Sequence, residues 1–318
     1  MTAAAAMADR RAGAVRTRRF VRPLRVMKWL ASSISIPLLC ACVTLTVEPR
    51  AVVSGPGGTA RVTTLRCDAV DRVLHAAGNG EPTDGLDRRA FKVLTWNIHK
   101  QADSGWENDL SAFAAVNDVV LLQEAVLQPP LHKILDNTGL RWSMASSFLL
   151  DADDIGVLTA TRIAPIASCT QRVVEPLIRI PKSAVITWLP IVETAVDTAA
   201  RTRETLAIVN VHSITFELSV DVYRSQLEAL ADALARHRGP IIFAGDFNTW
   251  NDARDRVVSE IAARLGLTEL NLRVDQRAVF FGRHLDHIFI RGLQIMDVSA
   301  LPVTSSDHNP MAATLRIP

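Results

Sequence analysis

Four short apolar runs in this chain of 318 residues each end in a cluster of polar side chains, and this pattern constrains the fold more than any other feature. The runs span residues 91–96, 118–122, 206–209 and 241–244. They are rich in β-branched residues and bounded by Gly, Asn or Asp, which is typical of buried strands. Polar groups at the ends of several strands can converge on one cleft, so the pattern predicts a site held by a rigid scaffold.

The clusters supply the candidate site residues. In chain order, they are Asn97, Gln123 with Glu124, Asn210 with His212, Asp246 with Asn248, Asp286, and Asp307 with His308. Because side chains alternate along a strand, we expect the two members of the third cluster to point the same way, as do those of the fourth. Turn chemistry alone explains any single cluster equally well. All of them together, in this order, favour a functional site.

The order of the clusters resembles the endonuclease/exonuclease/phosphatase superfamily, which has the DNase I-like fold. The resemblance covers roughly Phe91 to Ile317, and its most specific motifs are Gly245-Asp-Phe-Asn248 and Ser306-Asp-His308. Longer stretches, at 94–100, 210–223 and 281–286, are more similar to a small bacterial branch of the superfamily. The resemblance implies an α/β four-layer sandwich, in which two packed β-sheets have helices outside.

The pattern between the clusters agrees with alternating strands and helices. Residues 221–237 carry an apolar stripe at helical spacing and stop at Gly239-Pro240, which predicts a helix between two strands. A second helix is expected to begin near Asp252. Several strands without helices are expected around 141–191, and this arrangement suits two packed sheets with helices outside.

The N-terminal region differs from the rest in charge. Residues 1–50 hold nine of the 35 Lys and Arg residues and two of the 33 Asp and Glu residues, which leaves 26 basic and 31 acidic residues in 51–318. The uncharged run from Trp29 to Val47 resembles a bacterial secretion signal. Cys42 occupies the position of a lipoprotein's modified cysteine, and an uncleaved anchor of the ~20 residues that span a bilayer is a third reading. The alternatives are an N-terminal helix of a cytoplasmic protein and a misassigned start.

These features predict three parts: residues 1–50, a basic segment with the signal-like or anchor-like run; residues 51–90, a linker or a cover at the domain edge; and residues 91–318, the catalytic domain. We expect a protein that is exported to the bacterial periplasm or cell envelope, or anchored in the membrane, with a cytoplasmic location as the alternative. Cys67 and Cys169 can form one disulfide or remain two buried thiols, and their spacing does not decide between these states.

The candidate residues point to phosphate ester hydrolysis with Mg²⁺ or Mn²⁺. Glu124 and Asp307 are the expected metal ligands, with Asn97 binding directly or through water, because hard cations prefer oxygen ligands. The resemblance implies the same ligands. Cleavage of a phosphate ester needs such a cation, a positioned water and a stabilised leaving oxygen. A catalytically silent binding module on the same fold is the alternative, but it has no need of the whole set.

Each remaining candidate has an expected role. His308 is the candidate general base, and Asp286 is expected to orient it. Asp246 is expected to position the nucleophile or to donate to the leaving group. The other three, which are expected to bind the phosphate oxygens, are Asn210, His212 and Asn248.

The expected substrate is a phosphate ester, either a nucleic acid or a phospholipid or other small ester, and no protein partner is evident. A processive nuclease is usually basic, whereas residues 51–318 are acidic overall. The DNA-repair branch of the superfamily commonly has Asp where this chain has His99, and Tyr223 is the only tyrosine. Both departures argue against an abasic-site endonuclease. A zinc pair of His284 and His287 is unfavourable because residues three apart on a strand point to opposite faces.

Overall fold

The computed structural model describes residues 45–46, 50–55, 58–63, 67–70, 74, 85–192 and 204–318. Residues 43–318 form one compact unit through their mutual contacts. The basic stretch, nearly all of the uncharged run and Cys42 lie outside the described residues, so the predicted signal or anchor belongs to the part of the chain that the structure does not describe.

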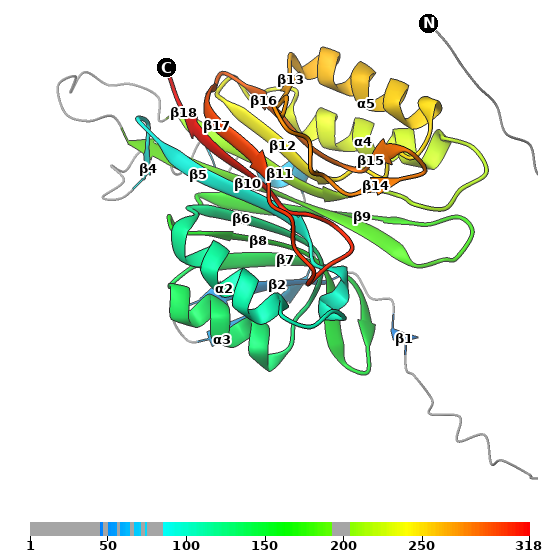
Figure 1. Ribbon diagram of the computed structural model, residues 1–318, viewed down its shortest axis with the longest axis horizontal. Helices are drawn as coiled ribbons and strands as arrows, with labels where there is room; N and C mark the ends of the chain where they lie inside the picture. The colour runs from blue at the N-terminus through cyan, green and yellow to red at the C-terminus, as the bar shows by residue number, and fades with distance from the viewer. Residues whose placement is uncertain are drawn as a thin grey trace, which may run out of the picture. The chain divides into compact units, whose positions relative to one another are not determined.

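Two β-sheets form the centre of this unit (Figure 1). The first has nine strands, in the order β17-β18-β5-β6-β8-β7-β2-β3, with β1 beside β7. The second has seven, in the order β13-β16-β12-β11-β10-β4, with β9 beside β10, and a separate hairpin pairs β14 with β15. The strands are β1 Leu45–Thr46, β2 Arg50–Gly55, β3 Gly58–Thr63, β4 Leu86–Asp87, β5 Phe91–Asn97, β6 Val119–Val126, β7 Arg141–Leu150, β8 Asp153–Thr161, β9 Ala167–Val174, β10 Pro181–Val192, β11 Thr205–His212, β12 Ile241–Asp246, β13 Thr268–Glu269, β14 Val279–Phe280, β15 Arg283–His284, β16 Asp286–Arg291, β17 Gln294–Ala300 and β18 Met311–Arg316.

The helices of the described residues lie outside the sheets. They are α2 Trp106–Val116, α3 Pro129–Thr138, α4 Asp221–Leu234 and α5 Asp252–Leu265, with the 3₁₀ turns η1 Cys67–Ala69 and η2 His99–Gln101. Figure 1 shows α2 and α3 against the first sheet, and α4 and α5 against the second. Both predicted helices are confirmed, although the first ends at Leu234. None of the described helices is long and apolar enough to cross a membrane.

Three apolar cores separate the four layers. Leu110 and Leu131 pack beneath the first pair of helices, and Leu227 and Val257 pack beneath the second pair. The third core lies between the sheets and contains Phe91, Val119, Ile208, Ile242 and Ile288. Each fully buried side chain of this size stabilises the fold by about 1.5–3 kcal/mol. The predicted four-layer α/β sandwich is thereby confirmed.

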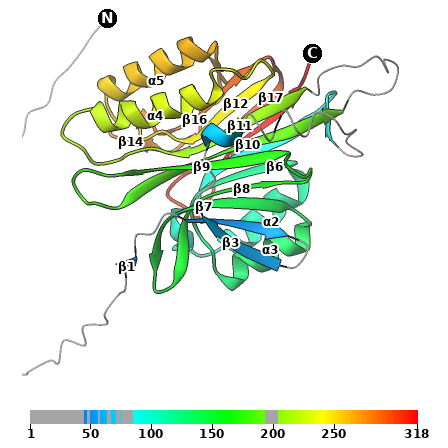
Figure 2. The ribbon, with the colours of Figure 1, turned by 180° about the vertical axis from the view of Figure 1, so that it is seen from behind.

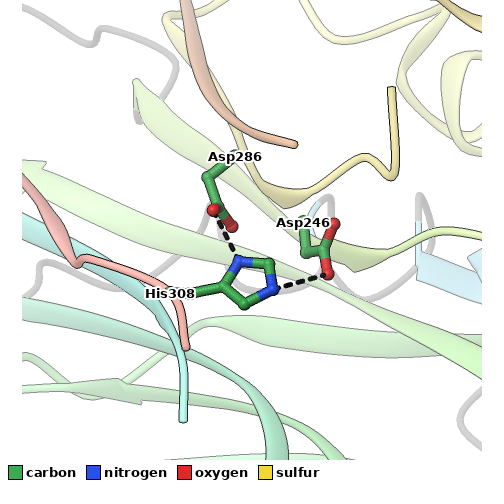
Figure 3. Close-up of side chains that lie close together, drawn as sticks. All are labelled: Asp246, Asp286 and His308. Carbon is green, nitrogen blue, oxygen red and sulfur yellow. Dashed lines mark hydrogen bonds and ion pairs between the residues drawn. The ribbon is translucent and has the colours of Figure 1, made fainter. Parts of the chain in front are cut away.

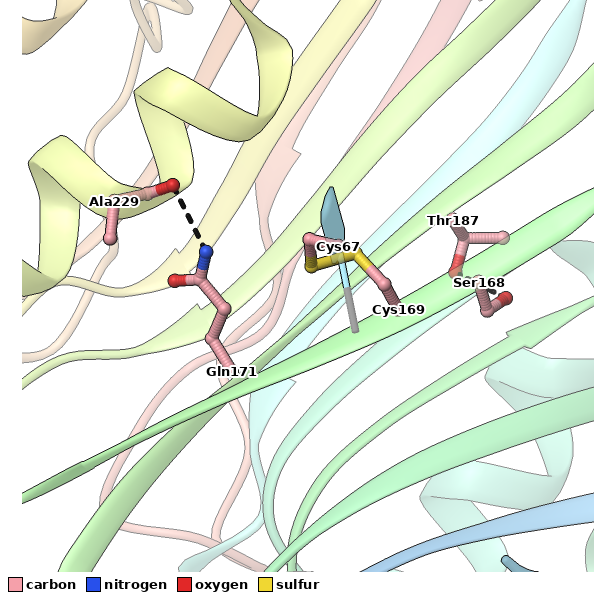
Figure 4. The surroundings of a disulfide bond; sticks show 6 residues. All are labelled: Cys67, Ser168, Cys169, Gln171, Thr187 and Ala229. Atoms are coloured by element: carbon pink, nitrogen blue, oxygen red, sulfur yellow. Dashed lines mark hydrogen bonds between the residues drawn. A yellow bond between two sulfur atoms is a disulfide. The ribbon is translucent and has the colours of Figure 1, made fainter. Parts of the chain in front are cut away.

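The segment expected to be a linker or an edge cover adds two strands to the first sheet. β2 pairs with β7, and β3 forms the edge beyond β2, as the rear view in Figure 2 shows. Cys67, just beyond them, forms a disulfide with Cys169 on β9 (Figure 4). The bond joins positions 102 residues apart, and it ties this segment to the second sheet. It also settles the choice that the cysteine spacing leaves open.

Strand direction brings the polar clusters to one end of the two sheets. β5 and β6 run parallel, so Asn97 and Gln123 lie side by side where these strands leave the core. β11 and β12 also run parallel, and they place His212 beside Asp246. β16 runs antiparallel to β12 and begins with Asp286 directly opposite Asp246. Both sheets therefore present their polar ends to the same cleft.

Candidate active site

Three titratable side chains, Asp246, Asp286 and His308, meet at the centre of this end (Figure 3). His308 comes from the loop before β18, and its Nδ1 lies 2.7 Å from Oδ2 of Asp286. Its Nε2 lies 4.0 Å from Oδ2 of Asp246. One ligand atom from each of the three falls within 4.8 Å of the others. The contact expected between His308 and Asp286 is thus present, and it leaves Nε2 facing the carboxylate of Asp246.

The loop that carries His308 is fixed to the end of β5. Nε1 of Trp96 donates to the backbone oxygen of His308 at 3.0 Å. Oγ of Ser306 donates to the backbone oxygen of Asn97 at 2.7 Å and accepts from the backbone N–H of His308 at 3.1 Å. The two hydrogen bonds to β5 join segments more than 200 positions apart, so the imidazole is held by the first sheet while its partner carboxylate belongs to the second.

Asp246 is buried and accepts hydrogen bonds on both oxygens. Nδ2 of Asn97 donates to Oδ2, and the backbone N–H of Asn248 donates to Oδ1, each at 2.9 Å. Burial raises the pKa of Asp246 to about 6, and the neighbouring His308 opposes this rise. The carboxyl group can therefore exchange a proton close to neutral pH.

The residues around Asp246 explain the Gly245-Asp-Phe-Asn248 motif. Gly245 has a φ of +135°, and a Cβ atom there would lie 2.1 Å from the backbone oxygen of Val211. Only glycine fits so close to the neighbouring strand. Asn248 has a φ of +50°, in the left-handed region that asparagine adopts more readily than most residues.

His308 carries a proton in these surroundings. Burial disfavours its charged form, but the carboxylates of Asp286, Asp246 and Asp307 outweigh burial and raise the pKa of His308 to about 10. The ring is then an imidazolium at neutral pH, whereas a general base must be neutral. A cation bound among these carboxylates would offset their charge and favour the neutral ring.

Glu124 sits in a distorted part of β6. The sequence predicts that this strand ends at Leu122, but it continues to Val126 through a bulge between Leu122 and Ala125. Glu124 has a φ of +53°, which is uncommon for a residue other than glycine. A bulge re-aims side chains, and here it brings the Glu124 carboxylate beside groups of the second sheet.

Two lysines that sequence reasoning missed surround Glu124. Nζ of Lys100 donates to Oε2 of Glu124, while Nζ of Lys182 lies 4.0 Å from Oε1. Lys182 Nζ is also 2.7 Å from Nε2 of His212. Burial opposes the charge of Glu124, yet the two lysines lower its pKa below the ordinary value. Burial, reinforced by Lys182, holds the pKa of His212 well below its usual range, so this imidazole is neutral and accepts from the lysine.

One of these lysines carried a signal in the sequence. Lys182 is the second residue of β10, a strand whose other members are largely apolar. Lysine is almost never buried unless it is paired, so a lone lysine in a buried strand indicates a charged partner. Burial lowers its pKa, although the carboxylates of Glu124, Glu175 and Asp246 oppose that shift. Lys100 is the last residue of the stretch at 94–100, and no spacing marked it as a site residue.

The third predicted ligand, Asp307, lies at the mouth of the cleft. Its side chain is 59% exposed, and Oδ1 is 3.8 Å from Nδ1 of His99, which contacts Asp103 at 2.7 Å. The donors that Glu124, Asp307 and Asn97 offer are oxygens, as a hard cation requires. Among the described residues, the acidic and imidazole groups whose ligand atoms lie within 4.8 Å of one another are those of Asp246, Asp286 and His308, so the central triad is a second candidate for holding a cation.

Asn210, predicted to bind phosphate, lies one layer below the cleft. It is fully buried, and its Oδ1 accepts from Nε2 of Gln123 at 2.6 Å. Its Nδ2 donates to the backbone oxygen of Leu158 at 2.9 Å. The amide therefore bridges the two sheets, and we do not include it among the phosphate-binding groups. His212, two residues further on, is the member of this cluster that reaches the cleft.

The two histidines considered as a zinc pair have separate partners. His284 Nε2 lies 3.2 Å from Oδ2 of Asp275, and His287 Nδ1 lies 2.6 Å from Oε1 of Glu269. His287 Nε2 also lies 2.7 Å from the hydroxyl of Thr249. Both nitrogens of His287 are thus engaged within the protein.

The two packed sheets with helices outside define a protein of the DNase I-like fold class. The chain belongs to the Endonuclease/Exonuclease/phosphatase family, whose model matches residues 94–308. It is 38% identical over 232 residues to a UPF0294 protein of Yersinia pseudotuberculosis, which covers 73% of this chain and 85% of that protein. This likeness confirms the bacterial branch expected from the sequence.

Solved structures share the fold at low sequence identity. The human Nocturnin catalytic domain superposes with a TM-score of 0.54 at 17% identity, covering 74% of this chain and 97% of that domain. An endonuclease/exonuclease/phosphatase from Bacteroides vulgatus gives a TM-score of 0.54 at 18% identity, covering 72% and 99%. At such identities the likeness establishes the architecture.

The bridging position of Asn210 can be separated from a catalytic role. Asn210→Ala should lower the free energy of unfolding by about 2–4 kcal/mol, because the Gln123 amide and the Leu158 carbonyl lose a buried partner. The comparison is His212→Ala, which should reduce phosphodiester hydrolysis with a smaller loss of stability. Urea unfolding and hydrolysis rates measure the two effects. A stable Asn210→Ala protein with a hundredfold lower kcat would return Asn210 to the phosphate-binding set.

Proposed function

We propose that this protein is a divalent-metal-dependent phosphodiesterase in which water attacks phosphorus directly. The observation that supports this most is the pair formed by His308 and Asp286, placed opposite the buried Asp246 and within the same cleft as Glu124. A silent binding module gains nothing from several buried ionisable groups, since each costs desolvation free energy. Perturbed titratable groups gathered in a cleft are characteristic of catalytic sites.

The proposed reaction uses Nε2 of His308 as the proton acceptor. Asp286 holds Nδ1, so the neutral ring has Nε2 available for a water molecule in the cleft. As the water oxygen forms its bond to phosphorus, its proton passes to Nε2, and the ester P–O bond breaks. The released alkoxide takes up a proton to become an alcohol, and Asp246, with its pKa near neutrality, is the proposed donor.

Lys182 and Lys100 extend the expected set of phosphate-binding groups. A phosphodiester brings one negative charge into the cleft, and a developing trigonal-bipyramidal phosphate brings more. Lys182, held between His212 and Glu124, is positioned to stabilise that charge, and Asn248 lies on the opposite side of Asp246. Fixed charges in a desolvated site stabilise a transition state without reorganisation.

Mg²⁺ or Mn²⁺ would be held by Glu124 and Asp307, with Asn97 beside them. When bound, such a cation supplies charge neutralisation and polarises a phosphate oxygen. Lys100 contacts Glu124 and would have to share this carboxylate with the cation.

Removal of the Glu124 charge tests the metal assignment. Glu124→Gln keeps the shape of the side chain but should weaken Mg²⁺ binding at least roughly tenfold. Changing a residue that only supports a metal ligand already weakens metal binding by that factor, so changing the ligand itself should cost no less. Calorimetric titration with Mg²⁺ and hydrolysis of a chromogenic phosphodiester measure the two effects. Glu228→Gln, on the outer surface of α4, is the matched control. Full activity of the unaltered protein in EDTA would show that no cation is required.

The pair of His308 and Asp286 should behave as one unit in kinetics. His308→Ala is expected to lower kcat by roughly 10²–10⁴, the usual scale for general acid–base catalysis. Asp286→Asn should lower kcat as well, while the double variant should be no worse than His308→Ala alone. Circular dichroism checks that each variant is folded. Multiplicative losses in the double variant would mean that the two residues act independently.

We also propose that the protein is exported or membrane-anchored through its N-terminal segment. The disulfide between Cys67 and Cys169 supports this, because such bonds persist in oxidising compartments outside the cytoplasm. Fractionation of bacteria should find the full chain in the envelope or periplasm, and a chain that starts at Ala51 in the cytoplasm. If both fractionate alike and Cys42→Ser changes nothing, the segment has no such role.

A further inference from the structure

Large apolar side chains are exposed mainly on three segments of the described chain. Of twelve such side chains, nine lie within 174–178, 216–218 and 274–281. Leaving out the smaller valines, the six that lie in these segments define what we call the apolar rim: Leu177, Ile178, Phe216, Leu218, Phe280 and Phe281. Phe281 is 78% exposed and Leu218 is 93% exposed. A soluble surface rarely gathers apolar groups in this way unless they contact another surface.

The first two segments contact one another, and the third contacts the start of α5. Oε1 of Glu175, in the turn from β9 to β10, accepts from the backbone N–H groups of Thr215 and Phe216. Arg283, which lies opposite Phe280 beside the turn of the β14–β15 hairpin, forms ion pairs with Asp252 and Asp255 at the start of α5. A hollow of about 530 Å³ lies between residues 217–221 and 250–254. The segments project from the same side in Figures 1 and 2.

Each segment adjoins a residue of the proposed active site. The turn from β9 to β10 leads directly into Lys182, and the loop with Phe216 follows His212. The hydroxyl of Thr249, next to Asn248, donates to the backbone oxygen of His284 at 2.7 Å. The segments of the apolar rim are therefore joined by short stretches of chain, or by this hydrogen bond, to elements that carry active-site residues.

We propose that the apolar rim docks on an anionic phospholipid surface, and that the substrate is a phosphodiester of a lipid in that surface. The proposal rests on the proposed phosphodiesterase function and adds the substrate class to it. Side chains at the tips of three separate loops can enter the boundary between headgroups and acyl chains, which brings the cleft between them to the depth of the lipid phosphates.

The chemistry of the rim favours lipid over nucleic acid. Leu177, Ile178 and Leu218 have no ring on which a base could stack. Arg179 is exposed beside Ile178, and Arg273 is exposed beside Val274, so two of the segments carry an exposed basic group beside an exposed apolar side chain. Basic residues flanking apolar tips suit anionic headgroups. The acidic excess of residues 51–318 disfavours a long polyanion across the whole domain.

Insertion of the rim can be read from a single new tryptophan in the full chain. Phe281→Trp, on the rim, is compared with Met296→Trp, which replaces a 54%-exposed side chain on β17. β16 begins at Asp286, in the proposed active site, and ends at Arg291. The chain then enters β17, so Met296, near the start of β17, lies away from the cleft. Brominated phosphatidylglycerol vesicles should quench the fluorescence added by Phe281→Trp but not that added by Met296→Trp. Membrane anchoring through the N-terminus would be common to both variants. Equal quenching, or none, would overturn the proposal.

Hydrolysis separates this proposal from the proposed function. Replacing both Phe280 and Phe281 by Ser should lower hydrolysis of phosphatidylglycerol in vesicles by about 10–100-fold, since each phenyl ring contributes to partition. Hydrolysis of a soluble chromogenic phosphodiester should change less than about twofold. A change of that size is small compared with the free energy that one buried phenyl ring contributes. The matched control replaces Ile295 and Met296 by Ser.

Three results would refute lipid docking. The first is unchanged hydrolysis of vesicle lipid by the rim variant. The second is that the unaltered protein cleaves plasmid DNA but not vesicle lipid, and that the rim variant no longer cleaves the plasmid. The third is a dimer in analytical ultracentrifugation that the rim variant abolishes without any quenching by vesicles, which would show that a second copy covers the rim. If the unaltered protein cleaves no phosphodiester at all, the proposed function fails instead, whatever the quenching shows.

Discussion

The hydrogen bond from Asn97 to Asp246 joins the two sheets at the end where both lose their apolar core. Asn97 closes β5 of the first sheet, and Asp246 closes β12 of the second. A buried carboxylate without such a donor would carry a large desolvation cost, so this contact stabilises the approach of the two strand ends. His308 depends on the same junction, because its loop is fastened to β5 while its partner Asp286 lies opposite Asp246.

Charged side chains are concentrated around this junction. Carboxylates and cations alternate from the second sheet to the first, and the neutral His212 lies between Lys182 and Asp246. Each group shifts the proton affinity of its neighbours, which is why Asp246 titrates near neutral pH and His308 does so far above it. Such a cluster costs stability, and the three apolar cores around it supply the stability that keeps it in place.

Sequence patterns anticipated most of the fold because the pattern of each element is local. The runs at 91–96 and 241–244 form strands, and the stripe at 221–237 forms α4, since burial of one face dictates these spacings. Pairing between distant strands is harder to recognise in the sequence. The bulge in β6, the two added strands at 50–63 and the disulfide to β9 all depend on partners far along the chain.

The sequence by itself determined which residues are available for chemistry: Glu124, Asp246, Asp286 and the Asp307-His308 pair follow or precede apolar runs. Only the tertiary structure decided how they are used. It placed Asn210 below the cleft, because the oxygen and the nitrogen of its side-chain amide both form hydrogen bonds with buried groups. It brought Lys100 and Lys182 to Glu124, and it left apolar side chains exposed on three separate segments. Burial and proximity between distant segments are properties of the packed sheets, and no local spacing encodes them.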